Sequence, residues 1–229
     1  MKILAIDTAT DACSAALFLD GEVTSRFELA PRRHTELILP MVGSLLEEAG
    51  LAVTDLDAVA FGRGPGAFTG LRIAAGVAQG LALGADLPVI PVSTLATMAQ
   101  QVMDEAGAEA VAAALDARMG EVYWGCYRRD AEGVAEPVGP ETVCAPQAVP
   151  VPPGDDWVGV GSGFATYGGL LASRLHAALA KTLPDVVPSA RAMHRLAVRA
   201  FARREILPAE EAQPIYLRDN VAEKPGARR

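Results

Sequence analysis

One segment restricts the fold of this chain more than any other, the run FGRGPGAFTGLRIAAGVAQGLA from Phe61 to Ala82. It begins like a buried strand, continues through a glycine-rich turn, and has the pattern of a helix from about Thr69 to Gly84. Because successive helical residues turn by about 100°, Arg72 and Gln79 share one narrow strip and the remaining surface is apolar or small. Such a helix must be covered on more sides than a sheet alone can cover.

The glycine-rich turn has the strand-to-helix position of a phosphate-binding loop. The Walker A spacing fails, because the fifth residue after Gly64 is Thr69 and the loop contains no lysine. A dinucleotide fingerprint fits the glycine spacing better, but its acidic residue, Asp86, precedes the next strand instead of following it. We therefore expect a structural loop. Its residues are Gly64, Pro65, Gly66, Thr69, Gly70 and Arg72.

Glycines also recur every four residues within the predicted helix, at Gly76, Gly80 and Gly84. Each costs roughly 1 kcal/mol relative to alanine, so three of them indicate a need for close packing. The preceding predicted helix, His34–Ala49, has a wide apolar arc of about 200°. The two helices could pack on each other, but we favour a protein–protein interface that uses both. Its predicted residues are Leu37, Met41, Leu45, Ile73, Gly76, Val77 and Gly80.

The order of predicted elements indicates an α/β protein with two related halves. Residues 1–107 have the pattern β-β-β-α-β-α-β-α, and residues 108–229 begin with an echo in which Asp116 follows an apolar strand as Asp7 does. A proline-rich connector, Pro146–Pro153, precedes the strand WVGVGS. Helices are expected near 165–179 and 190–204, and the last could pack back on the first half.

Composition excludes several classes of protein. The net charge of −8 repels phosphate polymers, which argues against a free-standing nucleic-acid-binding protein. Three widely spaced cysteines fit a reducing compartment, and only four apolar residues separate Lys2 from Asp7, too few for a signal peptide. Three histidines occur without metal-binding spacing. We expect a cytoplasmic protein with no membrane segment and no metal site.

Three further groups of residues have both a functional and a structural interpretation. Asp7 and Thr8 could hold a metal-bound phosphate or cap a turn. The glycine pair around Ser162 could approach a nucleotide or form an ordinary tight turn. Four arginines on one side of the last helix could face RNA or an acidic partner, or be a solvated face. The glycine group is Gly161, Ser162 and Gly163. The arginine group is Arg191, Arg195, Arg199 and Arg203.

The runs ILAIDTAT, FGRGPGAFTGLRIAAGVAQGLA, PVIPVSTL and PIYLRD, in this order and spacing, closely resemble the TsaB (YeaZ) family. The resemblance spans nearly the whole chain and is strongest over residues 1–106. It implies the duplicated fold of actin, Hsp70 and sugar kinases, with ribonuclease H-like halves and mixed sheets flanked by helices. Members of this family are partner subunits in bacterial formation of threonylcarbamoyladenosine in tRNA.

The resemblance also implies a division of labour. The catalytic relative TsaD binds ATP and a metal, and it modifies the adenosine beside the anticodon in tRNAs that read codons beginning with A. Its stretch matching VSTLATM carries a His-x-x-x-His pair, where this chain has Thr94 and Met98. The implied protein is a non-catalytic subunit without its own cofactor, with ATP and metal in the partner.

The implied partners are a TsaD-like subunit and a TsaE-like ATPase, with tRNA reached through the complex. The same apolar helices could pair two copies of this chain when the partner is absent. The alternative function is an ATP-dependent phosphotransferase or ATPase acting alone, with Asp7 at the metal and the loop around Ser162 at the adenosine.

Overall fold

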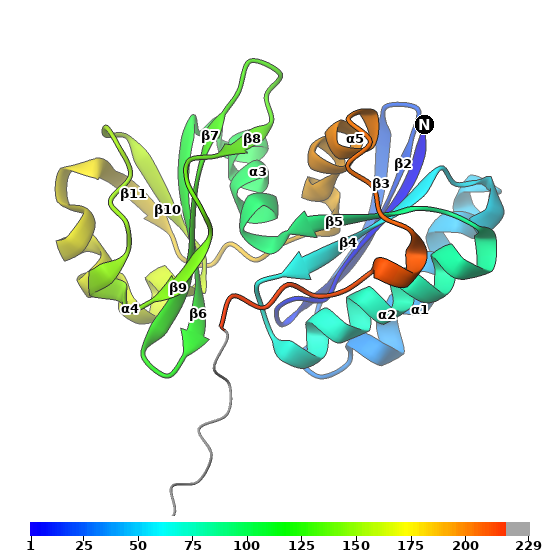
Figure 1. Ribbon diagram of the computed structural model, residues 1–229, viewed down its shortest axis with the longest axis horizontal. Helices are drawn as coiled ribbons and strands as arrows, with labels where there is room; N and C mark the ends of the chain where they lie inside the picture. Colours follow the sequence, from blue (N-terminus) through cyan, green and yellow to red (C-terminus); the bar gives the residue numbers. More distant parts are fainter. Residues whose placement is uncertain (219–229) are drawn as a thin grey trace, which may run out of the picture.

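The computed structural model describes residues 1–218, in which two sheets lie side by side (Figure 1). The first sheet has the order β3-β2-β1-β4-β5; β1, β2 and β3 form an antiparallel meander, and β4 and β5 run parallel to β1. The bounds of its elements follow the predicted pattern. They are β1 (Lys2–Asp7), β2 (Ala12–Leu19), β3 (Glu22–Leu29), α1 (His34–Ala49), β4 (Ala58–Gly64), α2 (Phe68–Ala85), β5 (Val89–Ser93) and α3 (Thr94–Ala106).

The second sheet repeats the first. Its order is β11-β10-β6-β7-β8, again with two antiparallel and two parallel pairings, so β6 stands where β1 stands in the first sheet. The echo between Asp7 and Asp116 therefore reflects a duplicated sheet. The elements are β6 (Ala110–Arg118), β7 (Glu121–Arg129), β8 (Ala135–Pro137), β9 (Thr142–Cys144), β10 (Trp157–Val160), α4 (Ser162–Leu175), β11 (Leu179–Leu183) and α5 (His194–Ala202).

Two predicted helices in the second half were placed wrongly. The helix expected near 165–179 begins earlier, at Ser162, and ends at Leu175, because residues 179–183 pair with β10 as an edge strand. The last helix is shorter than 190–204, since Ala190–Met193 form a 3-10 turn capped by the Ser189 hydroxyl and Arg204 has a left-handed φ of 58°. The predicted connector holds only a short 3-10 turn, Pro146–Ala148.

Alternate residues of β1 face two different cores. Leu4 and Ile6 pack with α1 and α2 on one face of the first sheet. Ile3 and Ala5 pack on the opposite face with the 190–193 turn and α5. Helix α5 thus lies against the first sheet (Figure 1). Its Leu196 also packs against the core of the second half.

Glycines allow the start of α2 to lie directly against the end of β1. A Cβ at Gly70 would lie 1.9 Å from the Thr8 carbonyl oxygen, and one at Gly66 would lie 2.4 Å from that of Ala9. Two hydrogen bonds fix this approach: the Thr8 hydroxyl donates to the Gly70 carbonyl at 2.7 Å, and the Ala67 amide donates to that of Ala9 at 2.7 Å. No larger residue fits at Gly66 or Gly70 without moving backbone.

Gly64 is required for a different reason. Its φ of +106° lies in the region that favours glycine, whereas Gly66 and Gly70 are not among the glycines with positive φ in the described chain. The turn is thus shaped by one glycine, and the helix is positioned by two others.

We expect Gly70→Ala to lower the free energy of unfolding by about 2–4 kcal/mol, because the added methyl would collide with a backbone oxygen. Urea unfolding followed by circular dichroism measures this. Gly76→Ala in the same helix is the matched control: its Cβ would meet nothing within 4 Å, so a gain of up to ~1 kcal/mol is expected. Equal effects of the two substitutions would contradict the close approach.

Candidate functional site: an open helix face beside an inter-half cleft

One side of α2 packs on the first sheet and the other faces outward. Leu71, Ala74 and Ala78 are buried, whereas Gly76 and Gly80 are exposed, with nothing within 4 Å of a Cβ at either position. Leu83, on the same outward side, is 57% exposed. Helix α2 has 18 residues and is long and apolar enough to cross a membrane. Its buried side, however, belongs to the core between the first sheet and helices α1 and α2. Small and apolar residues therefore line this outward side, with open space over Gly76 and Gly80.

The other predicted interface residues differ in exposure. Leu37 and Met41 on α1, and Ile73 and Val77 on α2, are partly buried and pack against the core under the helices. Leu45 is a correction, because it is 1% exposed and lies within that core. The apolar arc of α1 contains both covered and uncovered residues, and Leu45 supports the helix from beneath.

The loop residue Arg72 takes part in a contact that sequence reasoning missed. Its guanidinium lies 3.6 Å from the centre of the Phe68 ring, and its Nε donates to the Tyr216 hydroxyl at 3.2 Å. Tyr216 belongs to the PIYLRD run, 144 residues away in sequence. Thr69, by contrast, is exposed at the start of α2.

Asp7 and Thr8 are fully buried behind the glycine loop. The Asp7 Oδ1 accepts the amide of Ala9 at 3.0 Å, and the Thr8 hydroxyl donates to the Gly70 carbonyl, so both side chains hold turns in place. The Asp7 Oδ2 has no hydrogen-bond partner among the described residues, and it lies 2.2 Å from where a Cβ of Gly62 would be. Burial raises the pKa of Asp7 to about 6.

The glycine pair around Ser162 serves packing. A Cβ at Gly161 would lie 2.3 Å from the Met98 methyl, and one at Gly163 would lie 2.7 Å from the Ala114 methyl. The Ser162 hydroxyl accepts the amide of Asp116 at 3.0 Å. This turn therefore holds the start of α4 against β6, and Met98 fills the space at Gly161.

A cleft of about 540 Å³ lies between the two halves. Residues from both halves line it, including Thr10, Phe68, Asp116, Tyr123, Ser162 and Tyr216. Of the candidate nucleotide residues, Ser162 alone is part of this lining in the described chain. Asp116 is paired with Arg118 at 3.4 Å, and residues 1–218 contain no group of three or more His, Cys, Asp or Glu placed to hold a metal ion. Within residues 1–218, the cleft lining thus includes the hydroxyl of Ser162 and the carboxylate of Asp116.

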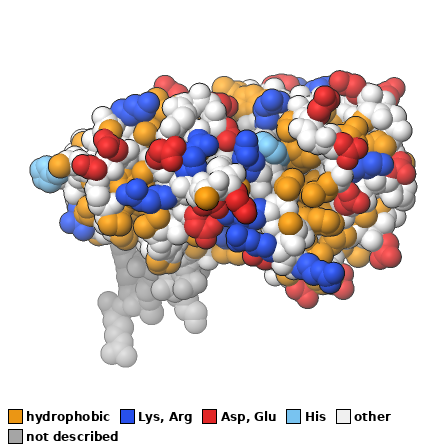
Figure 2. Space-filling model, turned by 90° about the horizontal axis from the view of Figure 1, so that it is seen from above, with side chains coloured by type: hydrophobic (Ala, Val, Ile, Leu, Met, Phe, Trp, Pro, Cys, Tyr) orange, Lys and Arg blue, Asp and Glu red, His pale blue; other side chains and the backbone are white. Residues whose placement is uncertain are grey.

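The four arginines near α5 do not form a continuous basic surface. Arg199 is 14% exposed and pairs with Asp130 at 2.7 Å and with Glu136 at 2.9 Å, which corrects its assignment to an RNA-facing patch. Arg195 pairs with Asp104 at 3.3 Å, and Arg191 donates to the Val23 carbonyl at 3.0 Å. Basic and acidic side chains are accordingly interspersed on this side of the molecule (Figure 2). Arg203 is exposed.

The raised pKa of Asp7 predicts a pH-dependent stability. Above pH 6 the buried carboxylate is charged in the folded protein, which lowers the free energy of unfolding. Between pH 6 and 3.8, the ordinary pKa of an aspartate, the folded state binds a proton that the unfolded state does not. The free energy of unfolding therefore rises as the pH falls through this range. At 1.36 kcal/mol per pKa unit, lowering the pH from 7.5 to 5 should raise the wild-type free energy of unfolding by about 1.4 kcal/mol relative to Asp7→Asn. Urea unfolding at both pH values measures this. Parallel pH profiles would contradict a buried, ionising Asp7.

The ion pairs of Arg199 predict a structural role. Arg199→Ala leaves two carboxylates without their cation between α5 and the β7–β8 hairpin, so we expect a loss of about 1–3 kcal/mol in the free energy of unfolding. Arg203→Ala, at the exposed residue that directly follows α5, should change it by less than about 0.5 kcal/mol. Thermal and urea unfolding compare the two variants. Equally small effects of both substitutions would contradict a structural role of the Arg199 ion pairs.

The repeated sheet and the cleft between the halves define a two-half α/β protein of the actin-like class. A family model described as TsaD, tRNA N6-adenosine threonylcarbamoyltransferase, matches residues 26–226. The chain is 48% identical to the tRNA threonylcarbamoyladenosine biosynthesis protein TsaB of Escherichia coli (strain K12), with 98% of this chain and 97% of that protein covered. The TsaB of Haemophilus influenzae is 44% identical, with 98% and 96% covered.

The solved structure of YeaZ from Pseudomonas aeruginosa superposes on the chain with a TM-score of 0.88 and 48% identity, covering 94% of this chain and 99% of that one. The family model carries the name of the transferase, whereas both near-full-length relatives carry the TsaB name. The chain belongs to the TsaB (YeaZ) family. The resemblance drawn from the sequence, and the actin-like fold expected from it, are confirmed.

Proposed function

We propose that this chain is a non-catalytic subunit for the formation of threonylcarbamoyladenosine in tRNAs that read codons beginning with A. It would act in the cytoplasm with a TsaD-like transferase and a TsaE-like ATPase. The observation that carries the proposal is the outward face of α2, where Gly76 and Gly80 leave open space beside the exposed Leu83. A face of small residues lets the backbone of a partner helix approach closely, and the apolar rim gives the contact its free energy.

The position of Met98 supports assigning the chemistry to the partner. Thr94 and Met98 are fully buried and stand where the resemblance places a pair of metal-binding histidines. Neither side chain is an imidazole, and the Met98 methyl occupies the space at Gly161. ATP and metal are therefore assigned to the TsaD-like subunit.

The net charge of −8, together with the paired arginines near α5, favours contact with tRNA through the complex. The same α2 face could pair two copies of this chain when the partner is absent. Such a homodimer would compete with the heterodimer, because both would use the same residues.

The test combines depletion with complementation. Nucleoside analysis of bulk tRNA should show loss of threonylcarbamoyladenosine when the chain is depleted, and wild-type chain should restore it. Gly76→Gln should fail to restore it and should weaken co-purification with the TsaD-like subunit by at least about 100-fold, since a long side chain would fill the close approach. Unfolding measurements on the isolated variant should show that the fold survives.

Gly169→Gln is the matched control, because Gly169 is also an exposed helical glycine with nothing within 4 Å of its Cβ, but lies on α4 in the second half. It should restore the modification fully. A Gly76→Gln variant that behaves like this control would overturn the assigned face. Unchanged threonylcarbamoyladenosine after depletion would overturn the function itself, and ATP turnover by the isolated chain would favour the phosphotransferase alternative.

A further inference from the structure

The segment Leu207–Arg218, here called the strap, connects features that lie far apart in the sequence. Leu207 forms two backbone hydrogen bonds with Val89, of 2.8 and 2.9 Å, at the start of β5. Ala209 and Ala212 then enter the core beneath α2, and the Gln79 side chain donates to the Glu210 carbonyl at 3.1 Å. The first part of the strap thus lies along one flank of α2 (Figure 1).

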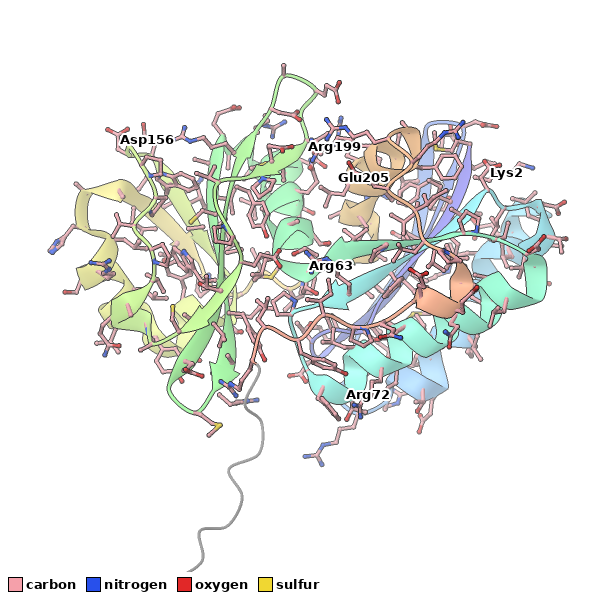
Figure 3. All side chains as sticks on the ribbon, viewed as in Figure 1. Lys2, Arg63, Arg72, Asp156, Arg199 and Glu205 are labelled. Carbon is pink, nitrogen blue, oxygen red and sulfur yellow. The ribbon has the colours of Figure 1, made fainter. Side chains whose placement is uncertain are left out.

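The middle of the strap is anchored at the glycine loop. The Ile215 amide donates to the Arg63 carbonyl at 2.8 Å, and Figure 3 places Arg63 between the two halves. Tyr216 follows, with its ring 5.6 Å from that of Phe68 and its hydroxyl bound to Arg72. Both contacts hold the strap to the start of α2.

Two residues later the strap reaches the second half. Arg218, whose side chain is 18% exposed, forms an ion pair with Glu121 and donates to the Ala117 carbonyl at 3.2 Å. Its other nitrogen lies 3.6 Å from the Met119 sulfur. Ala117 lies at the end of β6, Met119 in the turn, and Glu121 at the start of β7. A single extended stretch therefore ties the first turn of α2 to the β6–β7 hairpin of the other half.

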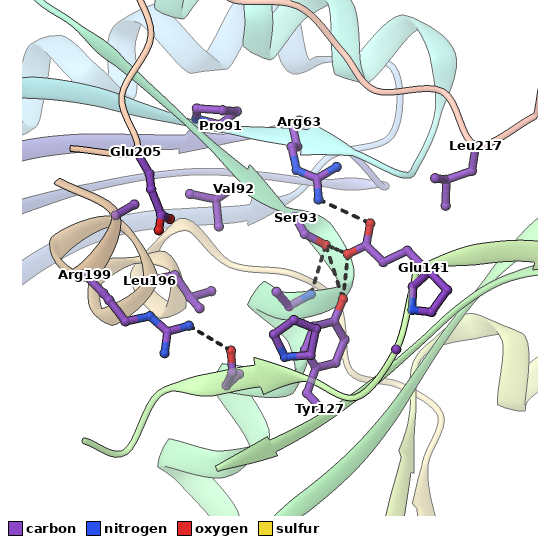
Figure 4. Close-up of a pocket in the computed structure, with 16 residues that line it drawn as sticks. Arg63, Pro91, Val92, Ser93, Tyr127, Glu141, Leu196, Arg199, Glu205 and Leu217 are labelled. Carbon is purple, nitrogen blue, oxygen red and sulfur yellow. Dashed lines mark hydrogen bonds and ion pairs between the residues drawn. The ribbon is translucent and has the colours of Figure 1, made fainter. Parts of the chain in front are cut away.

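Consecutive strap residues also face different cavities, as expected of extended chain. Tyr216 and Arg218 line the inter-half cleft, whereas Leu217 lines a separate cavity of about 500 Å³ (Figure 4). In that second cavity Arg63 lies 3.4 Å from Glu141, which also accepts the Tyr127 hydroxyl at 2.6 Å. The strap is therefore a wall between the two cavities as well as a link between the halves.

We propose that the strap is an inter-half clamp that sets how far the cleft opens. The Arg218 contacts hold the β6–β7 turn at a fixed place relative to α2, and the Tyr216 contacts fix the other end of the link. The strap also bonds Arg72 and Gln79, which flank the open face of α2. Releasing the clamp would free the cleft and would loosen one border of that face at the same time. This inference concerns the isolated chain and does not depend on any partner.

Hydrogen–deuterium exchange of the isolated full chain tests the clamp. In Arg218→Ala, amides of the β6–β7 turn and of the first turn of α2 should exchange about tenfold faster, because charge-assisted hydrogen bonds are lost. Amides of α1 and α4 should keep their rates. Glu121→Gln, which removes the charged partner and leaves the strap sequence unchanged, should give the same local pattern.

Gln213→Ala is the control, since Gln213 is an exposed strap residue with no side-chain hydrogen bond recorded within residues 1–218. It should leave every rate unchanged. Unchanged exchange in the β6–β7 turn of both Arg218→Ala and Glu121→Gln would overturn the clamp. Acceleration spread evenly over all elements would overturn it too, because that pattern reports global destabilisation.

Discussion

The close backbone contact between the end of β1 and the start of α2 determines much of this structure. With only hydrogen atoms at Gly66 and Gly70, the helix rests directly on the carbonyls of Ala9 and Thr8. This contact fixes where α2 begins and so which of its residues turn outward. Asp7 ends the same strand, and its fully buried carboxyl lies against Gly62 of β4 and has a raised pKa.

Sequence patterns predicted the first half well because its signals are local. Strand alternation, helix periodicity and the terminating residues Gly50 and Gly107 all act within a few residues of the element that they define. Counting from Gly64 was enough to exclude a Walker A loop. The strand β11 was missed because LAKTL is a short edge strand with polar residues, and such a segment differs little from a helix end.

Long-range contacts explain what sequence reasoning could not reach. Helix periodicity placed Arg199 on one side of α5, but the carboxylates of Asp130 and Glu136 come from a hairpin more than sixty residues earlier. The spacing of apolar residues placed Leu45 on the apolar arc of α1. It could not tell which part of that arc packs on the sheet and which part is exposed. The PIYLRD run carries no periodicity at all, and its contacts with Arg72 and Glu121 follow only from the folded path of the chain.

The exposed glycines of α2 affect the stability of the chain and therefore its expected lifetime in a cell. Each helical glycine forgoes up to ~1 kcal/mol relative to alanine, a sizeable share of the roughly 5–15 kcal/mol that keeps a domain folded. A ligand that binds only the folded chain adds stability in proportion to the logarithm of its concentration. If the complex proposed above forms, chain made in excess of its partner would lack this added stability, would populate unfolded forms more often and would be degraded faster. In that case proteolysis would lower the amount of free chain toward the amount held in the proposed complex.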